Sequence, residues 1–236
     1  MDVEIWSDVV CPWCYVGKRH FEEALGRFSH ADQVSVSWRS FELDPTSPRE
    51  VGMSMDRILE RKYGMTAEQA RAANQQMTSL AASVGLEYHL DQVRAGNTFD
   101  AHRLIHLAAI HGLGGALKER LLAAYFTEGR SVGDHATLAA LAAEVGLDPE
   151  EVDEMLASEA FAADVRADEA RANALGATGV PFFVIDETYG VAGAQGADVL
   201  LGVLERAWAE SHPLTLIEPA EPAPDGGACA DGACAV

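Results

Sequence analysis

Apolar and polar residues alternate at the start of the chain and then change to a helical spacing. Val3 and Ile5 alternate with polar neighbours as in a half-buried strand, and from Tyr15 onward apolar residues recur every three or four positions. Strict alternation returns at residues 34–38 and predicts a second strand that runs on to Pro45. Strand, helix and strand in this order form a βαβ unit, so we expect both strands in one sheet with the helix crossing on one face.

Helical patterns dominate between residues 48 and 176, where strand patterns nearly vanish. Thr66 and Gln69 have the spacing of a capping box, and Asp148 followed by Pro149 has the composition of a helix start. Apolar stripes that end at glycines mark the other helices. We therefore expect a subdomain of roughly six helices, which begin near residues 66, 97, 113, 134, 148 and 158.

Strand character returns near the end of the chain. Residues 178–186 are a nearly unbroken apolar run of the kind found in buried strands, with Pro181 near its head. Residues 189–193 predict the return strand of a hairpin. The apolar spacing of residues 197–208 predicts a final helix.

These patterns predict an α/β fold in which helices interrupt a sheet domain. Residues 1–47 and 177–212 are expected to form the sheet domain, and residues 48–176 the inserted helical subdomain. Residues 213–236 are rich in proline, alanine and glycine, which predicts a flexible C-terminal tail.

Two of the four cysteines, Cys11 and Cys14, lie where the first strand gives way to the first helix. Pro12 fits the first helical position, which makes Cys11 the cap residue. Free backbone N–H groups and the helix dipole are expected to lower the pKa of Cys11 below the usual thiol value of about 8.5. Cys14 is within disulfide reach on the same helix face. The pair predicts thiol–disulfide exchange, in which Cys11 attacks and Cys14 resolves the mixed disulfide.

The same spacing is also found in half of a zinc site. Two further ligands would be needed, and the only other cysteines, Cys229 and Cys234, lie at the far C-terminus with a spacing of five. A thiol-binding role without redox chemistry is a further alternative. The strand-to-helix context favours the redox interpretation, and we expect no metal at Cys11 and Cys14.

The composition indicates a folded, strongly acidic protein. Hydrophobic residues make up 48% of the chain, and 37 acidic against 17 basic side chains give a formal net charge of −20. A field of this sign repels nucleic acid and anionic membranes, so neither is an expected partner. The charge identifies no substrate and is otherwise typical of a solvated acidic surface.

The N-terminal sequence predicts a cytoplasmic location. Residues 1–4 contain neither a basic region nor an apolar region of a signal peptide, and no run approaches 18 apolar residues. Cysteine pairs in a reducing cytosol are seldom structural disulfides. The expected location therefore gives further weight to a catalytic role for the pair.

Several sequence blocks together resemble the DsbA-like thioredoxin-fold oxidoreductases, and most of all their cytoplasmic FrnE-like branch. The resemblance extends over residues 2–210, and its specificity comes from the joint occurrence of the blocks in this order. The blocks are Ser7-Asp8, Cys11-Pro12-Trp13-Cys14-Tyr15, Trp38-Arg39-Ser40-Phe41-Glu42-Leu43, Asn97-Thr98, Ala101-His102-Arg103-Leu104, Ala124-Tyr125-Phe126, Gly179-Val180-Pro181-Phe182-Phe183 and Gly193-Ala194-Gln195.

The resemblance implies a thioredoxin-like fold with a large helical insertion and a reactive Cys11. It also implies a cis bond between Val180 and Pro181 facing that cysteine, with the backbone of Val180 binding an extended substrate segment. Pro12 and Trp13 would form the substrate-facing helix start. The expected substrates are thiol or disulfide proteins or small molecules, with glutathione as a co-substrate and no other cofactor. By analogy we also expect a homodimer.

One block departs from the pattern that DsbA itself has. DsbA usually carries histidine between the proline and the second cysteine, where this chain has Trp13. Tryptophan has no imidazole to hold a thiolate, so we expect a less depressed pKa for Cys11 and a weaker oxidant than DsbA.

A second hypothesis is a glutathione-dependent transferase or isomerase. Hydroxychromene-carboxylate isomerases and kappa-class glutathione transferases resemble this family but have serine at the position of Cys11, so the pair of Cys11 and Cys14 argues against their chemistry. His102 belongs to a block that matches the family, and we expect it to line the substrate cleft from the insertion side.

Cys229 and Cys234 are expected to be an auxiliary redox pair that exchanges with Cys11. Some FrnE-like proteins are similar in carrying a second pair with this spacing. The alternative is an incidental or metal-binding tail, because exposed cysteines bind soft metals readily. A non-catalytic thiol-binding or metal-binding module is therefore a third hypothesis.

Overall fold

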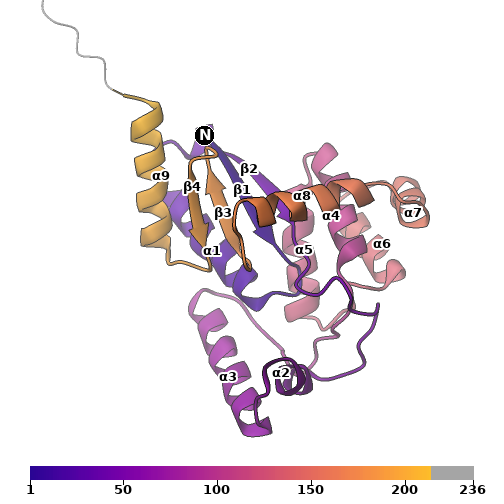
Figure 1. Cartoon of the computed structure of the whole chain (residues 1–236). Coiled ribbons are helices and arrows are strands. Elements are labelled where there is room, and N and C mark those ends of the chain that lie inside the picture. Colours follow the sequence, from indigo (N-terminus) through magenta and orange to yellow (C-terminus); the bar gives the residue numbers. More distant parts are fainter. Residues whose placement is uncertain (214–236) are drawn as a thin grey trace, which may run out of the picture.

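A computed structural model describes residues 1–213 of the chain. Its sheet has four strands in the order β2, β1, β3, β4 (Figure 1). β1 (Asp2–Ser7) pairs in parallel with β2 (Ser35–Ser40) and antiparallel with β3 (Phe182–Ile185), and β3 pairs antiparallel with β4 (Tyr189–Ala192). This arrangement confirms the predicted βαβ unit and the predicted hairpin.

Two helices, α1 (Pro12–Arg27) and α9 (Ala197–Ser211), cover one face of the sheet. The alternation at the start of the chain directs Val3 and Ile5 of β1 to this face, where they are buried with apolar side chains of both helices. The rings of Phe21 in α1 and Phe183 in β3 lie 5.9 Å apart between their centroids. These buried contacts hold α1 against the sheet.

The other face of the sheet is covered by α8 (Ala162–Ala174). Trp6 of β1 is buried with Ala172, and its Nε1 donates a hydrogen bond to the carbonyl oxygen of Asp168 at 2.8 Å. We predicted this helix as part of the insertion, and it also packs against α4 (Phe99–Ile110) of the insertion. α8 therefore joins the sheet to the inserted helices.

Seven helices lie between residues 48 and 176, one more than predicted. The missed helix is α2 (Met55–Tyr63), which Ser54 caps. It has only nine residues and none of them is fully buried, so its apolar repeat was too short to be recognised. The five others beside α8 are α3 (Ala67–Ser83), α4 (Phe99–Ile110), α5 (Gly114–Phe126), α6 (His135–Glu144) and α7 (Pro149–Ala157). The predicted capping box of Thr66 and Gln69 is present.

The core of the insertion continues into the sheet domain. Val9, Tyr15 and Val16, at the start of α1, are buried in the same apolar cluster as Leu104 of α4 and Leu121 of α5. The start of α1 is therefore held between the sheet and the inserted helices.

β2 ends at Ser40, whereas the sequence predicted a strand that continues to residue 45. Carboxylates take the next free N–H groups: Glu42 N donates to Glu169 at 3.1 Å, and Leu43 N donates to Asp8 at 2.8 Å. Because these N–H groups bond to side chains and not to a neighbouring strand, the sheet stops there.

Truncation of the core beneath α1 should destabilise the whole fold. Phe183 is completely buried, so we expect Phe183→Ala to lower the free energy of unfolding by about 3–5 kcal/mol, through lost burial and the cavity that remains. Urea denaturation measures this change. Tyr63→Ala, at an exposed residue of α2, is the control and should change stability by less than about 0.5 kcal/mol. Equal effects of the two substitutions would contradict this description of the core.

Candidate active site

Cys11 is the N-cap residue of α1, as predicted. Its backbone is extended (φ −90°, ψ 113°), and Pro12 occupies the first helical turn. The N–H of Cys11 donates to the carbonyl oxygen of Asp8 at 3.3 Å, which closes the turn between β1 and α1. The Cys11 side chain makes no capping hydrogen bond, so its thiol is available to another part of the chain.

The Cys11 thiol faces the loop before β3. Its Sγ donates a hydrogen bond to the carbonyl oxygen of Val180, 169 positions away in the sequence, over 3.6 Å. The peptide bond between Val180 and Pro181 is cis, as the resemblance implied. Cys11 and the backbone of Val180 thus lie together at one site.

A close approach at Gly17 holds α1 against this loop. A Cβ atom at this position would lie 2.8 Å from Cγ of Pro181 and 3.4 Å from Cβ of Ala194. Any other residue would therefore displace Pro181 or tilt α1. The sequence reasoning missed Gly17, although a glycine inside a helical pattern is a signal for close packing.

Cys14 lies behind Cys11 in the first turn of α1. Its backbone N–H donates to the carbonyl oxygen of Cys11 at 3.0 Å, and both cysteines are free thiols in this structure. Cys11 keeps 4% of its surface exposed and Cys14 only 1%. Of the two thiols, Cys11 is therefore the more accessible from solvent, although both are buried.

The surroundings raise the pKa of Cys11 well above its usual range. The largest cause is the hydrogen bond with the side chain of Cys14, followed by burial and by the charge of Cys14, and the Asp8 carboxylate raises the pKa of Cys11 further. The backbone N–H of Cys14 lowers this pKa, but its effect is smaller than that of the side-chain hydrogen bond. This differs from the sequence expectation of a lowered pKa. That expectation considered the helix terminus alone and not the burial of the pair.

The chain matches a known protein family over most of its length. A family model described as a DSBA-like thioredoxin domain matches residues 2–205. The chain belongs to this family. The match includes the sheet and the inserted helices, which confirms the thioredoxin-like fold with a helical insertion. The FrnE-like branch stays a prediction.

Solved members of this fold include oxidoreductases and an isomerase. A probable DsbA oxidoreductase from Streptomyces coelicolor is 49% identical, with a TM-score of 0.86 and coverage of 96% of this chain and 97% of that one. A cytosolic disulfide reductase, DsbM from Pseudomonas aeruginosa, is 19% identical (TM-score 0.62, coverage 89% and 100%). A 2-hydroxychromene-2-carboxylate isomerase is 15% identical (TM-score 0.67, coverage 89% and 98%) and, like DsbM, shares the fold.

Pro12 and Trp13 follow Cys11 and form the first residues of α1. Trp13, two residues after Cys11, is half exposed, so the start of α1 presents a large apolar side chain to the surface. The hydroxyl of Tyr88 donates to the carbonyl oxygen of Pro12 at 2.8 Å and ties the start of α1 to the insertion. Tyr88 was not predicted, because nothing in its local sequence indicates a partner so far away.

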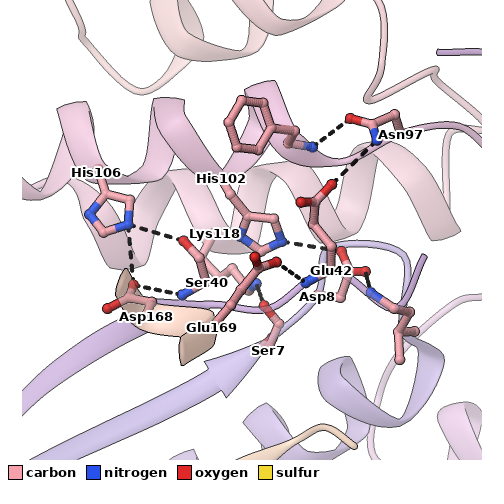
Figure 2. Close-up of polar contacts among 12 residues, drawn as sticks. Ser7, Asp8, Ser40, Glu42, Asn97, His102, His106, Lys118, Asp168 and Glu169 are labelled. Carbon is pink, nitrogen blue, oxygen red and sulfur yellow. Dashed lines mark hydrogen bonds and ion pairs between the residues drawn. The ribbon is translucent and has the colours of Figure 1, made fainter. Parts of the chain in front are cut away.

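His102 lies deeper than the sequence suggested. Its side chain is 1% exposed, and its Nε2 lies 3.3 Å from Oδ1 of Asp8, which is equally buried (Figure 2). Burial raises the pKa of Asp8, but the hydrogen bond and charge of His102, the N–H of Leu43 and the charge of Lys118 outweigh it and hold that pKa below its usual value. His102 thus faces the turn that carries Cys11, and its contact with a substrate stays a prediction.

Ser40, His106 and Asp168 meet nearby but do not form a hydrolase triad. Nε2 of His106 lies 3.0 Å from Ser40 Oγ and 3.2 Å from Asp168 Oδ2, so one ring nitrogen faces both partners (Figure 2). A triad needs the two ring nitrogens for the two partners. Ser40 is also buried, so these three residues serve as a structural contact between β2, α4 and α8.

The remaining predicted residues lie outside the described part of the chain. Cys229 and Cys234 belong to residues 214–236, beyond the range that the structure describes. Within residues 1–213, no group of three or more His, Cys, Asp or Glu side chains is placed to hold a metal ion. Over the same range, none of the helices has the length and hydropathy needed to span a bilayer.

The raised pKa of Cys11 predicts the pH dependence of its reactivity. Only the thiolate reacts with iodoacetamide, so the alkylation rate of Cys11 in the reduced protein should still rise as pH passes about 8.5. Mass spectrometry of the alkylated peptide measures this rate. In Cys14→Ala, which removes the largest cause of the shift, the profile should move to lower pH. A plateau below pH ~7 in the unmodified protein would contradict this prediction.

Proposed function

We propose that this protein is a thiol–disulfide oxidoreductase in which Cys11 is the nucleophile and Cys14 the resolving cysteine. The observation that carries the proposal is the position of the Cys11 thiol, 3.6 Å from the carbonyl oxygen of Val180, with Cys14 three residues further along in the first turn of α1. An extended substrate paired with the backbone of Val180 would present its sulfur to Cys11. Trp13 would add apolar contact beside it.

Two displacement steps account for the chemistry. The Cys11 thiolate attacks one sulfur of a substrate disulfide, which forms the mixed disulfide and releases the other substrate sulfur as a thiolate that takes up a proton. Cys14 then loses its proton and attacks Sγ of Cys11. The bond between Cys11 and Cys14 forms, the mixed disulfide breaks, and the second substrate thiol leaves with two electrons transferred in total.

We further propose that reduction in the cytoplasm is the main direction, with glutathione as the thiol that restores Cys11 and Cys14. A raised pKa supports this direction, because strong oxidants of this type derive their potential from a stabilised thiolate. DsbM, which shares the fold, is named a cytosolic disulfide reductase and was also solved with GSH.

Serine variants test the two cysteine roles. With a peptide that contains one internal disulfide and glutathione as reductant, Cys11→Ser should reduce turnover to that of glutathione alone, because the nucleophile is lost. Cys14→Ser should accumulate a mixed disulfide at Cys11, detected by mass spectrometry, and lose most of its turnover. Circular dichroism checks that both variants fold.

Full turnover in Cys14→Ser would contradict the proposal and favour the second candidate, a glutathione-dependent transferase or isomerase. The shared fold with 2-hydroxychromene-2-carboxylate isomerase is the observation that keeps this candidate under test. In such an enzyme Cys14 would not take part in the reaction.

We also propose that Cys229 and Cys234 exchange with Cys11 and Cys14. Fifteen residues lie between Pro213 and Cys229, and this length of chain spans at most about 55 Å, which exceeds the length of about 20 Å of the six-residue strand β1. In Cys229→Ala/Cys234→Ala, reduction by glutathione should slow while Cys11 still forms mixed disulfides. Unchanged turnover, or stoichiometric zinc binding that the double variant abolishes, would contradict the exchange role.

A further inference from the structure

Lys118 is a buried lysine in the apolar face of α5. Its side chain is 1% exposed, and lysine is almost never buried to this degree without a paired charge. Its Nζ donates to the carbonyl oxygen of Ser7 at 2.9 Å and lies 5.8 Å from the centroid of the Trp38 ring. Within residues 1–213 no carboxylate lies at ion-pair distance from it. The ammonium therefore has a dipole and an aromatic face as neighbours, but no paired anion.

The groups whose charge, when they ionise, acts on Lys118 belong mainly to the turn between β1 and α1 and to the first turn of α1. Burial lowers the pKa of Lys118 to about 8, whereas the charges of Cys14, Asp8 and Cys11, in that order, act to raise it, and Lys18 of α1 acts to lower it. Cys14 is thus the anionic group with the largest influence on the ammonium. The influence is mutual, because each charge stabilises the other to the same extent.

Asp8 accepts no hydrogen bond from Lys118, although its negative charge acts on the ammonium from a distance. One carboxylate oxygen of Asp8 pairs with Nε2 of His102 at 3.3 Å, and the other accepts the N–H of Leu43 at 2.8 Å (Figure 2). Both oxygens are therefore engaged by groups other than Lys118. Lys118 Nζ therefore makes no direct ion pair with Asp8, and a thiolate at Cys14 would act on it more strongly than Asp8 does.

We propose that Lys118 is a positioning residue that stabilises the buried thiolate of Cys14 when it attacks the mixed disulfide. The inference rests on the proposed exchange between Cys11 and Cys14. In that step Cys14 gives up its proton, its sulfur bonds to Sγ of Cys11, and the electron pair leaves with the substrate sulfur. The inserted helices, which carry Lys118 and His102, thereby supply the charges beneath the cysteine turn.

Removal of this charge should favour the disulfide. At a pH high enough for the reduced pair to carry a thiolate, the ammonium stabilises that form and has no such effect on the neutral disulfide, so Lys118 makes the pair more oxidising there. The equilibrium is measured at such a pH. Lys118→Met, similar in length and uncharged, should shift the equilibrium with glutathione toward the disulfide by about tenfold, which is about 30 mV for a two-electron couple. The rate of mixed-disulfide resolution near pH 7 should fall, and its pH profile should move to higher pH.

Two variants serve as controls. Lys118→Arg keeps the charge and should retain most of the equilibrium constant, which a merely structural role of the side chain would not explain. Lys62→Met, at an exposed residue of α2, should change nothing. If Lys118→Met folds and its equilibrium constant and pH profile match those of the unmodified protein, the inference is wrong.

A measurement on the unmodified protein covers the case in which Lys118→Met fails to fold. Carbon-13 NMR of the lysine side chains follows the titration of Lys118 in the disulfide and dithiol forms. The pKa of Lys118 should be higher in the dithiol form, and equal values in the two forms would overturn the inference. If no disulfide forms between Cys11 and Cys14 at all, the proposed function fails instead, so the two failures are distinguishable.

Discussion

Buried hydrogen bonds between the end of β1 and the inserted helices fix the position of the reactive cysteine. The buried polar cluster consists of Ser7, Asp8, His102 and Lys118, in which Lys118 bonds to the Ser7 carbonyl oxygen and His102 to the Asp8 carboxylate. Cys11 begins α1 three residues after Asp8 and donates its N–H to the Asp8 carbonyl oxygen. Unpaired polar groups are costly at this depth, so the start of α1 depends on the insertion.

The same cluster determines the electrostatics of the pair. Burial and the neighbouring thiol make charge on Cys11 unfavourable, and a wholly apolar interface would add to that cost. A buried ammonium at Lys118 offsets part of it, while His102 and Leu43 engage the Asp8 carboxylate. These charges surround a cysteine pair that has Trp13 at the position where DsbA usually carries a histidine.

The sequence predicted what depends on local patterns and missed what depends on distant contacts. Alternation at Val3 and Ile5 and the Pro12 signal located the strand and the helix cap, and the resemblance supplied the cis bond before Pro181. Neither local patterns nor the helix dipole showed that Cys11 is buried, so its pKa was assigned the wrong direction. The position of Lys118 within the apolar stripe of its helix indicates a buried lysine. Its partner, the carbonyl oxygen of Ser7, lies 111 positions away and could not be predicted from the local sequence.

The most direct test of this account is the redox equilibrium of Cys11 and Cys14. The protein is equilibrated in glutathione buffers of graded potential, its thiols are blocked, and each cysteine is assigned by differential alkylation and mass spectrometry. Conversion of both cysteines together, at a potential between about −270 and −120 mV, is the predicted result. If Cys11 stays free or becomes only glutathionylated while Cys14 never pairs with it, the pair is not an exchange site and the central claim is wrong.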